Sequence, residues 1–298
     1  MIDVDRKVNK EIMKKFLILG VNGMAGHIIA KYLTEQGHTV YGFARQEGPV
    51  CETMIGDATN KEDVRQALQE HAYDYVVNAI GVLNRFVDAH PADGIYLNSV
   101  LPHFLAEELA GTKTKLIHIS TDCVFEGTKG HYMEADRPDA SSYYGRSKAL
   151  GEICDDRNLT IRTSIVGPEL KANGIGLFHW FMMQKGTVSG YKKVIWSGVT
   201  TLQLAKVIAQ ECENPQTGLY HLVNNEFISK YNLLGLFDRY CRQSPISIQE
   251  EMTTVSDKTL INTRSEQPFA VPDYDEMVRE MGEWIRNHPD LYQQYKGV

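Results

Sequence analysis

The chain has 298 residues, of which 43% are hydrophobic, so it can form one large or two modest domains with a sizeable core. Its net charge of -7 is spread without long runs of either sign, which argues against a nucleic-acid-binding surface and against a polybasic membrane patch. The chain has no apolar run of membrane-spanning length, no signal-peptide core and only five scattered cysteines, so we expect reduced thiols, a cytoplasmic location, no membrane partner and no metal site.

The first predicted strand, residues 16–19, is a short apolar run that ends in glycine, as buried parallel strands do. The polar residues 1–13 before it form a predicted N-terminal extension. Gly20, Gly23 and Gly26 follow in GxxGxxG spacing and lead into an amphipathic helix. These glycines suit a tight turn, a close approach to a pyrophosphate and tight packing of helix on sheet, and the helix N-terminus offers N–H groups to the anion. A dinucleotide site is therefore favoured over a glycine-rich turn without a ligand.

The second predicted strand, residues 38–43, ends without the acidic residue that would hold the ribose 2′-hydroxyl of NAD. Arg45 follows instead, and a guanidinium suits a 2′-phosphate. We therefore expect NADPH, with NADH as the alternative cofactor and a solvated arginine as the alternative without function. Asp57, after a third strand, either accepts a hydrogen bond from the adenine amino group or caps a helix over residues 61–71.

A fourth predicted strand, residues 75–81, ends in a small-residue turn beside the cofactor, and the next helix is expected over residues 94–110. The residues expected to contact the cofactor in these segments are Gly20, Asn22, Gly23, Met24, Ala25, Gly26, Arg45, Asp57, Ala58, Ala79, Ile80, Gly81 and Asn98.

Chemistry is expected where the fifth predicted strand, residues 115–120, ends, because reactive groups of a doubly wound sheet gather at the carboxyl ends of its strands. The next helix contains Tyr144 and Lys148, whose spacing of four stacks both side chains on one face. A tyrosine normally ionises at about 10, and a neighbouring ammonium lowers its pKa toward a useful range. The spacing alone also occurs by chance on surface helices. The catalytic interpretation of this pair is strengthened by the nucleotide motif upstream and by the Thr121 hydroxyl, which lies in the sequence between that motif and Tyr144.

Alternating strands and helices up to a sixth strand, residues 159–164, predict an α/β fold with a Rossmann-type doubly wound parallel sheet. Beyond residue 167 the alternation stops, and we expect a smaller, interrupted C-terminal substrate lobe. The predicted domains are the extension 1–13, an NAD(P)-binding domain 14–167 and a lobe 168–298 whose chain also returns to the Rossmann domain. The lobe is expected to contain a turn at 173–176, a loop at 196–198 and helices at 177–184, 201–211, 229–242 and 274–287.

Together these motifs resemble the extended short-chain dehydrogenases/reductases. The stretches that carry the resemblance are the glycine motif from Gly20, NAIG from Asn78, STD from Ser120 and YGRSKALGE from Tyr144. Within that group, TDCVFEG (121–127) and IRTS (161–164) are most similar to the dTDP-4-dehydrorhamnose reductase branch. The resemblance covers roughly residues 14–285 and implies a Rossmann domain, an NAD(P)(H) cofactor and a nucleotide-linked sugar in the cleft.

The resemblance also implies residue roles. Tyr144 would be the general acid, Lys148 would lower its pKa and bind the nicotinamide ribose, and Thr121 would polarise the substrate carbonyl. Tyr144 and Lys148 are thereby cofactor contacts as well. The expected reaction is the NADPH-dependent reduction of a 4-keto-6-deoxy nucleotide sugar for polysaccharide biosynthesis.

Cys123 separates this chain from neighbouring branches. Dehydratases of the group have a Glu base at that position, and rhamnose-type reductases commonly have Tyr. A cysteine at this position resembles an epimerase-reductase branch, in which a Cys and a His move protons at the epimerised carbons. His179 lies in about the right segment for the role of that His. A small buried thiol and a packed histidine are the alternatives that we favour.

The remaining substrate candidates are Asp122, Cys123, Arg162 and Trp196, with Arg264 as a further cation. Either arginine is a candidate for pairing with a nucleotide diphosphate, while Arg162 equally suits a structural cation and Trp196 equally suits a core aromatic. A second alternative function is a cofactor-binding regulatory subunit without sugar turnover, like a reductase-like relative that binds methionine adenosyltransferase. The sequence leaves open a homodimer, the nucleotide, the sugar and the C4 configuration of the product.

Overall fold

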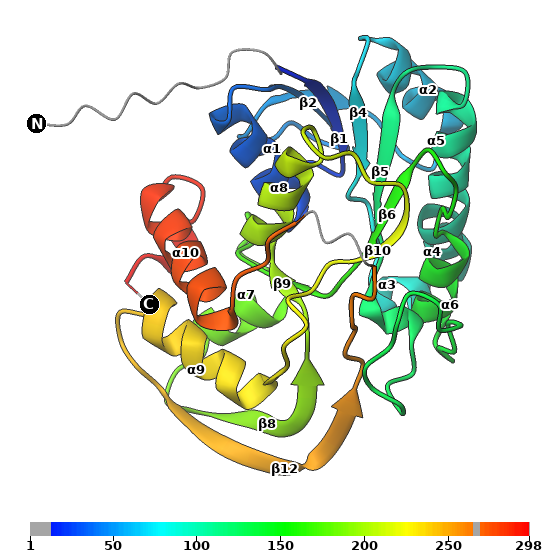
Figure 1. Cartoon of the computed structure of the whole chain (residues 1–298). Coiled ribbons are helices and arrows are strands. Elements are labelled where there is room, and N and C mark those ends of the chain that lie inside the picture. Colours follow the sequence, from blue (N-terminus) through cyan, green and yellow to red (C-terminus); the bar gives the residue numbers. More distant parts are fainter. Residues whose placement is uncertain (1–12, 265–268, 298) are drawn as a thin grey trace, which may run out of the picture.

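The core of the molecule is a parallel sheet of strands β1 (Lys15–Leu19), β2 (Thr39–Ala44), β3 (Glu52–Ile55), β4 (Tyr75–Asn78), β5 (Lys115–Ile119), β6 (Leu159–Arg162) and β10 (Gly218–His221). The computed structural model describes residues 13–264 and 269–297, and within them this sheet has seven strands in the order β10-β6-β5-β4-β1-β2-β3 (Figure 1). The chain winds outward from β1 in both directions, so the crevice between β1 and β4 is the expected place for a ligand. The predicted α/β fold with a doubly wound parallel sheet is confirmed.

Helices cover both faces of this sheet. They are α1 (Gly26–Glu35) and α8 (Thr201–Gln210) on one face, and α2 (Lys61–Gln69) and α5 (Leu101–Leu109) on the other (Figure 1). Along β1 the buried side chains alternate, with Phe16 and Ile18 in the first core and Leu17 and Leu19 in the second. Because successive strand residues point to opposite faces, a strand buried on both sides is continuously apolar, which is why this strand was predictable.

The helical stretch that carries Asn98 is longer than predicted and is built from several segments. It consists of α3 (Asn84–Ala89), α4 (Pro91–Ile95), the π-helical segment η1 (Tyr96–Val100) and α5. The predicted helical stretch over 94–110 is confirmed in the main, because helical structure is continuous from Pro91 to Leu109, but it begins earlier than predicted and includes a π segment at Asn98. The wider π turn lets the Asn98 side chain bond to the backbone of Val82, and such turns often mark functional sites.

The second half of the chain contains more strand than predicted. Its elements are α6 (Tyr143–Leu150), β7 (Ile165–Val166), α7 (Leu177–Met182), β8 (Thr187–Trp196), β9 (Val199–Thr200), β11 (Ile228–Ser229), α9 (Lys230–Cys241), β12 (Ser247–Asp257) and α10 (Tyr274–Asn287). In the described part, β11, β8 and β12 form a three-stranded sheet, and α9 packs on β8 (Figure 1). Trp196 ends β8 rather than lying in the predicted loop.

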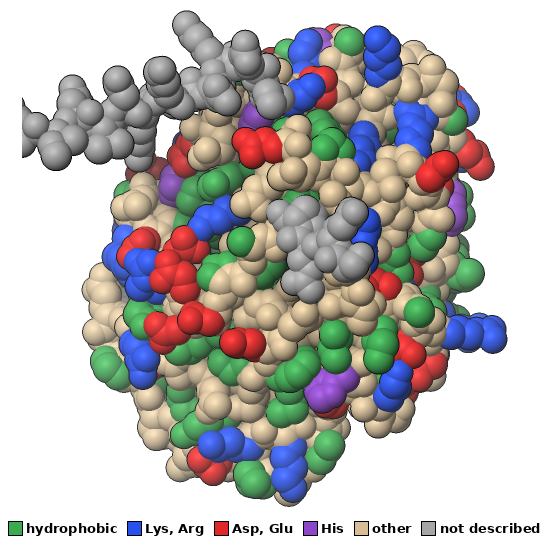
Figure 2. Space-filling view, viewed as in Figure 1, with side chains coloured by type: hydrophobic (Ala, Val, Ile, Leu, Met, Phe, Trp, Pro, Cys, Tyr) green, Lys and Arg blue, Asp and Glu red, His purple; other side chains and the backbone are tan. Residues whose placement is uncertain are grey.

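The predicted domain division between residues 167 and 168 stays a prediction, and residues 1–12 of the predicted extension lie outside the described residues. Acidic and basic side chains are interspersed on the face shown in Figure 2. A search of the described residues for a helix both long and apolar enough to cross a membrane finds none.

Candidate active site

The turn between β1 and α1 is shaped for a close-approaching anion. A Cβ placed on Gly26 would lie 2.3 Å from the carbonyl oxygen of Gly20, so the first turn of α1 packs against the turn at a distance that only glycine allows. No side chain caps the start of α1, and its first turn has no acidic residue. The free N–H groups and the positive end of the helix dipole therefore fit a pyrophosphate.

Asn22 joins this turn to the segment that follows β2. Its Nδ2 donates to the carbonyls of Gln46 (2.8 Å) and Glu47 (3.3 Å). Its buried Oδ1 has no hydrogen-bond partner among the described residues and lies against Gly48, where an added Cβ would come within 1.9 Å of it, so Asn22 fixes the glycine turn to this segment. Arg45 lies exposed just beyond the end of β2 and so at the rim of the cradle that the glycine turn forms.

Asp57 does not cap α2, so that alternative is wrong. The cap is Asn60, whose side chain accepts from the Glu62 amide at 3.0 Å. Asp57 instead accepts hydrogen bonds from the amide and hydroxyl of Thr59, and these bonds, with the nearby Arg45 charge, hold its pKa below the usual value. Its carboxylate therefore stays ionised near the rim where the adenine amino group was expected.

The turn after β4 lies beside the glycine turn. A Cβ placed on Gly20 would meet Ile80 at 3.0 Å, and the Ile80 amide donates to Asn78 Oδ1 at 3.2 Å. Gly81 borders open space. Asn98 holds the end of this turn through both of its amide atoms, at 3.1 Å from each Val82 backbone group. The predicted cofactor residues of β1 and β4 thus share one edge of the sheet, with Ala58, Ala79, Met24 and Ala25 in the adjoining turns.

One glycine brings the Tyr144 helix onto the end of β5. A Cβ on Gly145 would lie 2.2 Å from the carbonyl oxygen of Cys123, so α6 packs directly on the turn that begins at Thr121. The Thr121 hydroxyl accepts from the Cys123 amide at 3.1 Å and donates to Asp122 Oδ1 at 3.1 Å. Tyr144 is 8% exposed and lies close enough to Thr121 for that side chain to act on its pKa, although the two hydroxyls share no hydrogen bond. Side chains from two separate elements therefore lie near each other at the carboxyl end of β5.

Burial governs the ionisation of the central groups. Lys148 is 3% exposed; burial lowers its pKa to about 8, and the charge of Glu152 acts in the opposite direction. Its Nζ donates to the Ile119 carbonyl at 2.7 Å. Burial raises the pKa of Tyr144, although the Thr121 side chain opposes the rise. The predicted lowering of the Tyr144 pKa is therefore wrong for this structure, because desolvation of the phenolate is the largest influence on it and the charges of Cys123 and Asp122 act in the same direction.

Two lysines that the sequence did not single out face the same end of β5. Burial raises the pKa of Asp122, and the positive charges of Lys230 and Lys258 act against that rise. Lys258 also packs on Gly127, where an added Cβ would lie 2.7 Å from its Cγ. Lys230 begins α9 and Lys258 follows β12, so neither belongs to a recognisable motif. Only the folding of the second half of the chain places them here.

Several predicted candidates instead lie in the protein interior. Arg162 is 2% exposed and binds Glu152 through two bonds, which favours the structural cation that the sequence left open. Trp196 packs beside Tyr274 in the core, as the alternative core aromatic would. His179 Nδ1 lies 2.8 Å from the Tyr295 hydroxyl and is likewise buried.

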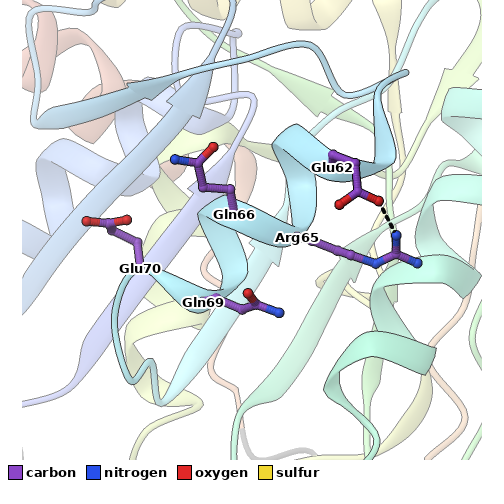
Figure 3. A pocket seen from close by; sticks show the side chains of 5 residues that line it. All are labelled: Glu62, Arg65, Gln66, Gln69 and Glu70. Carbon is purple, nitrogen blue, oxygen red and sulfur yellow. Dashed lines mark hydrogen bonds and ion pairs between the residues drawn. The ribbon is translucent and has the colours of Figure 1, made fainter.

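Arg264 binds the carbonyl of Thr217 and the side chain of Gln216, and its guanidinium lies over the Tyr220 ring. Two of its N–H groups are therefore engaged near β10. The depression drawn in Figure 3 is a separate feature, because side chains of α2 and the residue after it line it: Glu62, Arg65, Gln66, Gln69 and Glu70. Arg65 there pairs with Glu62, as the dashed line in Figure 3 marks.

Comparison with known proteins gives one family. The family model described as "RmlD substrate binding domain" matches residues 13–267. The chain is 35% identical over 139 residues to the "Probable low-salt glycan biosynthesis reductase Agl14" of Haloferax volcanii, a match that spans 45% of this chain and 46% of that protein. The chain thus matches about half the length of that relative.

A second relative is matched over nearly its whole length. It is the "dTDP-4-dehydrorhamnose reductase" of Aggregatibacter actinomycetemcomitans, 24% identical over 290 residues that span 88% of this chain and 96% of that protein. Among solved structures, the dTDP-4-dehydrorhamnose reductase of Bacillus anthracis in complex with NADP matches with a TM-score of 0.76 and 18% identity, over 91% of this chain and 99% of that chain. This structural likeness shows the fold.

Proposed function

The chain belongs to the RmlD substrate binding domain family, and from this premise we propose that it is an NADPH-dependent reductase of a 4-keto-6-deoxy nucleotide sugar, acting in polysaccharide biosynthesis. Relatives over part or nearly all of the chain are named as a glycan biosynthesis reductase and as dTDP-4-dehydrorhamnose reductase, which supports this reaction class.

One observation carries the proposal: the side chains of Thr121 and Tyr144 lie near each other at the carboxyl end of β5, with Lys148 buried one helical turn from Tyr144. In a doubly wound sheet this edge also receives the dinucleotide, and the uncapped start of α1 lies along it. Two neighbouring hydroxyls suit a substrate oxygen that becomes negatively charged.

The residues divide the work of the reduction. NADPH, when bound, supplies the hydride that reaches the substrate carbonyl carbon. With substrate bound, the Thr121 hydroxyl would turn its one hydrogen from Asp122 to the carbonyl oxygen, and Tyr144 would donate its phenolic proton to the same oxygen as negative charge develops. Lys148, protonated below its pKa of about 8, stabilises the phenolate left on Tyr144. The high pKa of the buried phenol keeps it protonated until that moment.

The structure and charges support further contacts. Arg45 at the cradle rim would hold the 2′-phosphate of NADPH, and Gly20, Gly23 and Gly26 would receive the pyrophosphate. Lys230 and Lys258, which face Asp122, would hold the diphosphate of the nucleotide sugar. Replacing both lysines by methionine is expected to raise the KM for the sugar substrate ~10-fold or more while leaving NADPH affinity unchanged.

The epimerase-reductase alternative is less well supported. Burial raises the pKa of Cys123 to about 12, so this thiol rarely ionises near neutral pH. His179, its predicted partner, is committed to Tyr295 in the core. Solvent deuterium appearing at C3 or C5 of the product, and disappearing in Cys123→Ser, would favour the epimerase instead.

We also propose a homodimer and a cytoplasmic location. Exposed apolar side chains gather on the packed elements α3 to α6, namely Phe86, Ile95, Val100, Tyr143 and Leu150. Covering them with a second copy would remove this apolar area from water. Light scattering that gives a monomer mass at micromolar concentration would contradict the dimer.

The cytoplasmic location is supported by the five unpaired cysteines, which suit a reducing compartment.

The reaction is tested by NADPH oxidation on adding dTDP-, UDP- or GDP-linked 4-keto-6-deoxy sugars, with the product configuration read by NMR. Turnover of at least one sugar, and its loss in Tyr144→Phe, is the expected result. NADPH binding without turnover of any of the three sugars, together with capture of a tight protein partner, would favour the regulatory-subunit alternative.

A further inference from the structure

A buried ion pair lies directly behind the candidate active site. Glu152, just after the end of α6, faces Arg162 at the end of β6, with Nε–Oε1 at 2.8 Å and Nη2–Oε2 at 2.5 Å. The two side chains are only 5% and 2% exposed. Such a two-point pair fixes orientation as well as distance, because the planar guanidinium and carboxylate meet edge to edge.

The carboxylate of this pair touches both halves of the catalytic arrangement. Glu152 belongs to the chain that leaves the Tyr144 helix, and its Oε1 accepts from the Ser120 hydroxyl at 2.7 Å. Ser120 directly precedes Thr121 at the end of β5. One carboxylate therefore ties the end of the helix that carries Tyr144 and Lys148 to the strand end that carries Thr121.

The arginine is held on its remaining sides. Its Nη1 lies 2.9 Å from His221 Nε2, and His221 Nδ1 donates to the Ile261 carbonyl at 2.9 Å, so Nε2 is the acceptor. Burial lowers the pKa of His221 to about 4, which keeps this imidazole neutral near pH 7. The guanidinium also lies 5.0 Å from the centre of the Phe125 ring. The Arg162 side chain is therefore too buried to contact a substrate phosphate, and its contacts hold it in one position.

We propose that Glu152 and Arg162 are positioning residues that set the register of α6 against the end of β5, and so the placement of Tyr144 and Lys148 relative to Thr121. The inference rests on the reductase function proposed above. A buried ion pair is a weak source of stability compared with apolar packing, whereas its directional bonds specify one arrangement. Catalysis needs that arrangement, because misplacement by about 1 Å can cost ~100-fold in rate.

The same carboxylate also acts on Lys148, four residues before it. The titratable and charged groups around Lys148 are Tyr144 and Glu152 of its own segment, His118 of β5 and, behind Glu152, Arg162 of β6. Burial keeps His118 neutral, since its pKa lies well below the usual value. Glu152 therefore favours the protonated form of Lys148 against the effect of burial.

Two substitutions separate geometry from charge. Glu152→Asp keeps the charge but shortens the side chain, so kcat is expected to fall ~10- to 100-fold while the alkaline limb of the pH profile stays in place. Glu152→Gln removes the charge and sets an amide N–H against Arg162, so kcat falls similarly and the alkaline limb moves to lower pH. The KM values for NADPH and sugar are expected to change less than ~3-fold in both variants. Glu280→Gln, which breaks the partly buried pair with Lys206, is the matched control and keeps both kcat and profile.

The outcome can be read even if the reductase function fails. Titration of Lys148 by NMR, assigned with Lys148→Met, should give a lower pKa in Glu152→Gln than in the wild type, whether or not any sugar turns over. Amide exchange in α6 should accelerate in Glu152→Asp at temperatures well below unfolding. Unchanged titration in Glu152→Gln together with unchanged exchange in Glu152→Asp would overturn the proposal, as would a loss of kcat that only follows the loss of folded protein.

Discussion

At the scale of single residues, the phenol of Tyr144 is the sharpest test of the site. Tyr144→Phe is expected to lower kcat ~100- to 10,000-fold, because the buried proton donor beside Thr121 is lost. NADPH affinity should change little, since the ring that packs against the turn remains. Steady-state kinetics and fluorescence titration measure the two effects. Tyr143→Phe, one residue earlier and 56% exposed, is the control that keeps full activity. Near-normal reduction by Tyr144→Phe would contradict the assignment.

Arg45 carries the prediction of cofactor preference. Arg45→Ala is expected to weaken NADPH binding ~10- to 100-fold, because a charge-assisted bond to the 2′-phosphate is lost, and to leave NADH binding nearly unchanged. Dissociation constants for both cofactors check this. Arg239→Ala, on the exposed face of α9, should change neither constant. A wild-type protein that prefers NADH would show that Arg45 is only a solvated side chain.

Residues were predictable where local spacing carries the chemistry. Tyr144 and Lys148 share a helix, and Gly20 and Gly26 share one turn, so their relation is set within a few positions. Lys230 was not predictable, because only the folded lobe brings it near Asp122. The raised pKa of Tyr144 was missed for a related reason: desolvation depends on what packs around a side chain, which no local pattern records.

At the scale of elements, the contact between α6 and the turn after β5 is set by a missing side chain. Gly145→Ala would place a methyl group 2.2 Å from the Cys123 carbonyl oxygen, so α6 must move away from Thr121. We expect the free energy of unfolding to fall by ~1–3 kcal/mol and kcat to fall more than tenfold.

Urea unfolding and kinetics test this element contact. Gly235→Ala in α9 is the matched control, since an added Cβ there meets nothing within 4 Å. That change should stabilise the protein by ~0.5–1 kcal/mol, because alanine favours the helix interior. A Gly145→Ala protein as stable and as active as the wild type would show that α6 does not depend on this close approach.

The elements that sequence analysis missed share a physical reason. Strands of the parallel sheet are apolar on both faces and stand out, whereas β12 exposes much of its length and reads as a polar segment. The π segment around Asn98 was missed because an extra residue in a helical turn leaves no compositional mark. The sequence mark of this segment is Asn98 itself, a polar residue at a buried helix position where an apolar residue would otherwise be expected.

At the scale of the whole molecule, the last residues of the described chain fasten the layers together. Tyr292 accepts from Trp284 Nε1 at 3.0 Å and donates to His27 Nε2 of α1 at 3.0 Å. Tyr295 accepts from the Glu169 amide and contacts His179 of α7. The chain thus returns to the face of the sheet where it began, and its C-terminal aromatic residues link α1, α7 and α10. Removing this segment would open the core on that face.

Buried neutral histidines, of which His27 belongs to this C-terminal link, also make the stability of the fold depend on pH. Burial lowers the pKa of His27 and of His221 to about 4, and that of His118 well below its usual value. His27 donates through Nδ1 to the Gly23 carbonyl at 2.7 Å, so its Nε2 must stay unprotonated to accept from Tyr292. The folded protein therefore resists protonation that the unfolded chain accepts from about pH 6.5 downward.

Because the unfolded state binds more protons in this range, the free energy of unfolding should fall as pH falls from 6.5 to about 4. Each histidine lowers the free energy of unfolding by up to ~1.4 kcal/mol per pH unit in this range. Above the unfolded pKa the histidine is neutral in both states, so no stability is lost there. Urea unfolding across this range measures the slope. His27→Gln, whose amide can replace the bond from Tyr292, should reduce the slope by about one proton, whereas His90→Gln at an exposed position should leave it unchanged. A wild-type slope near zero between these pH values would mean that the buried imidazoles take up protons without unfolding, and that the C-terminal link through Tyr292 survives a charged His27.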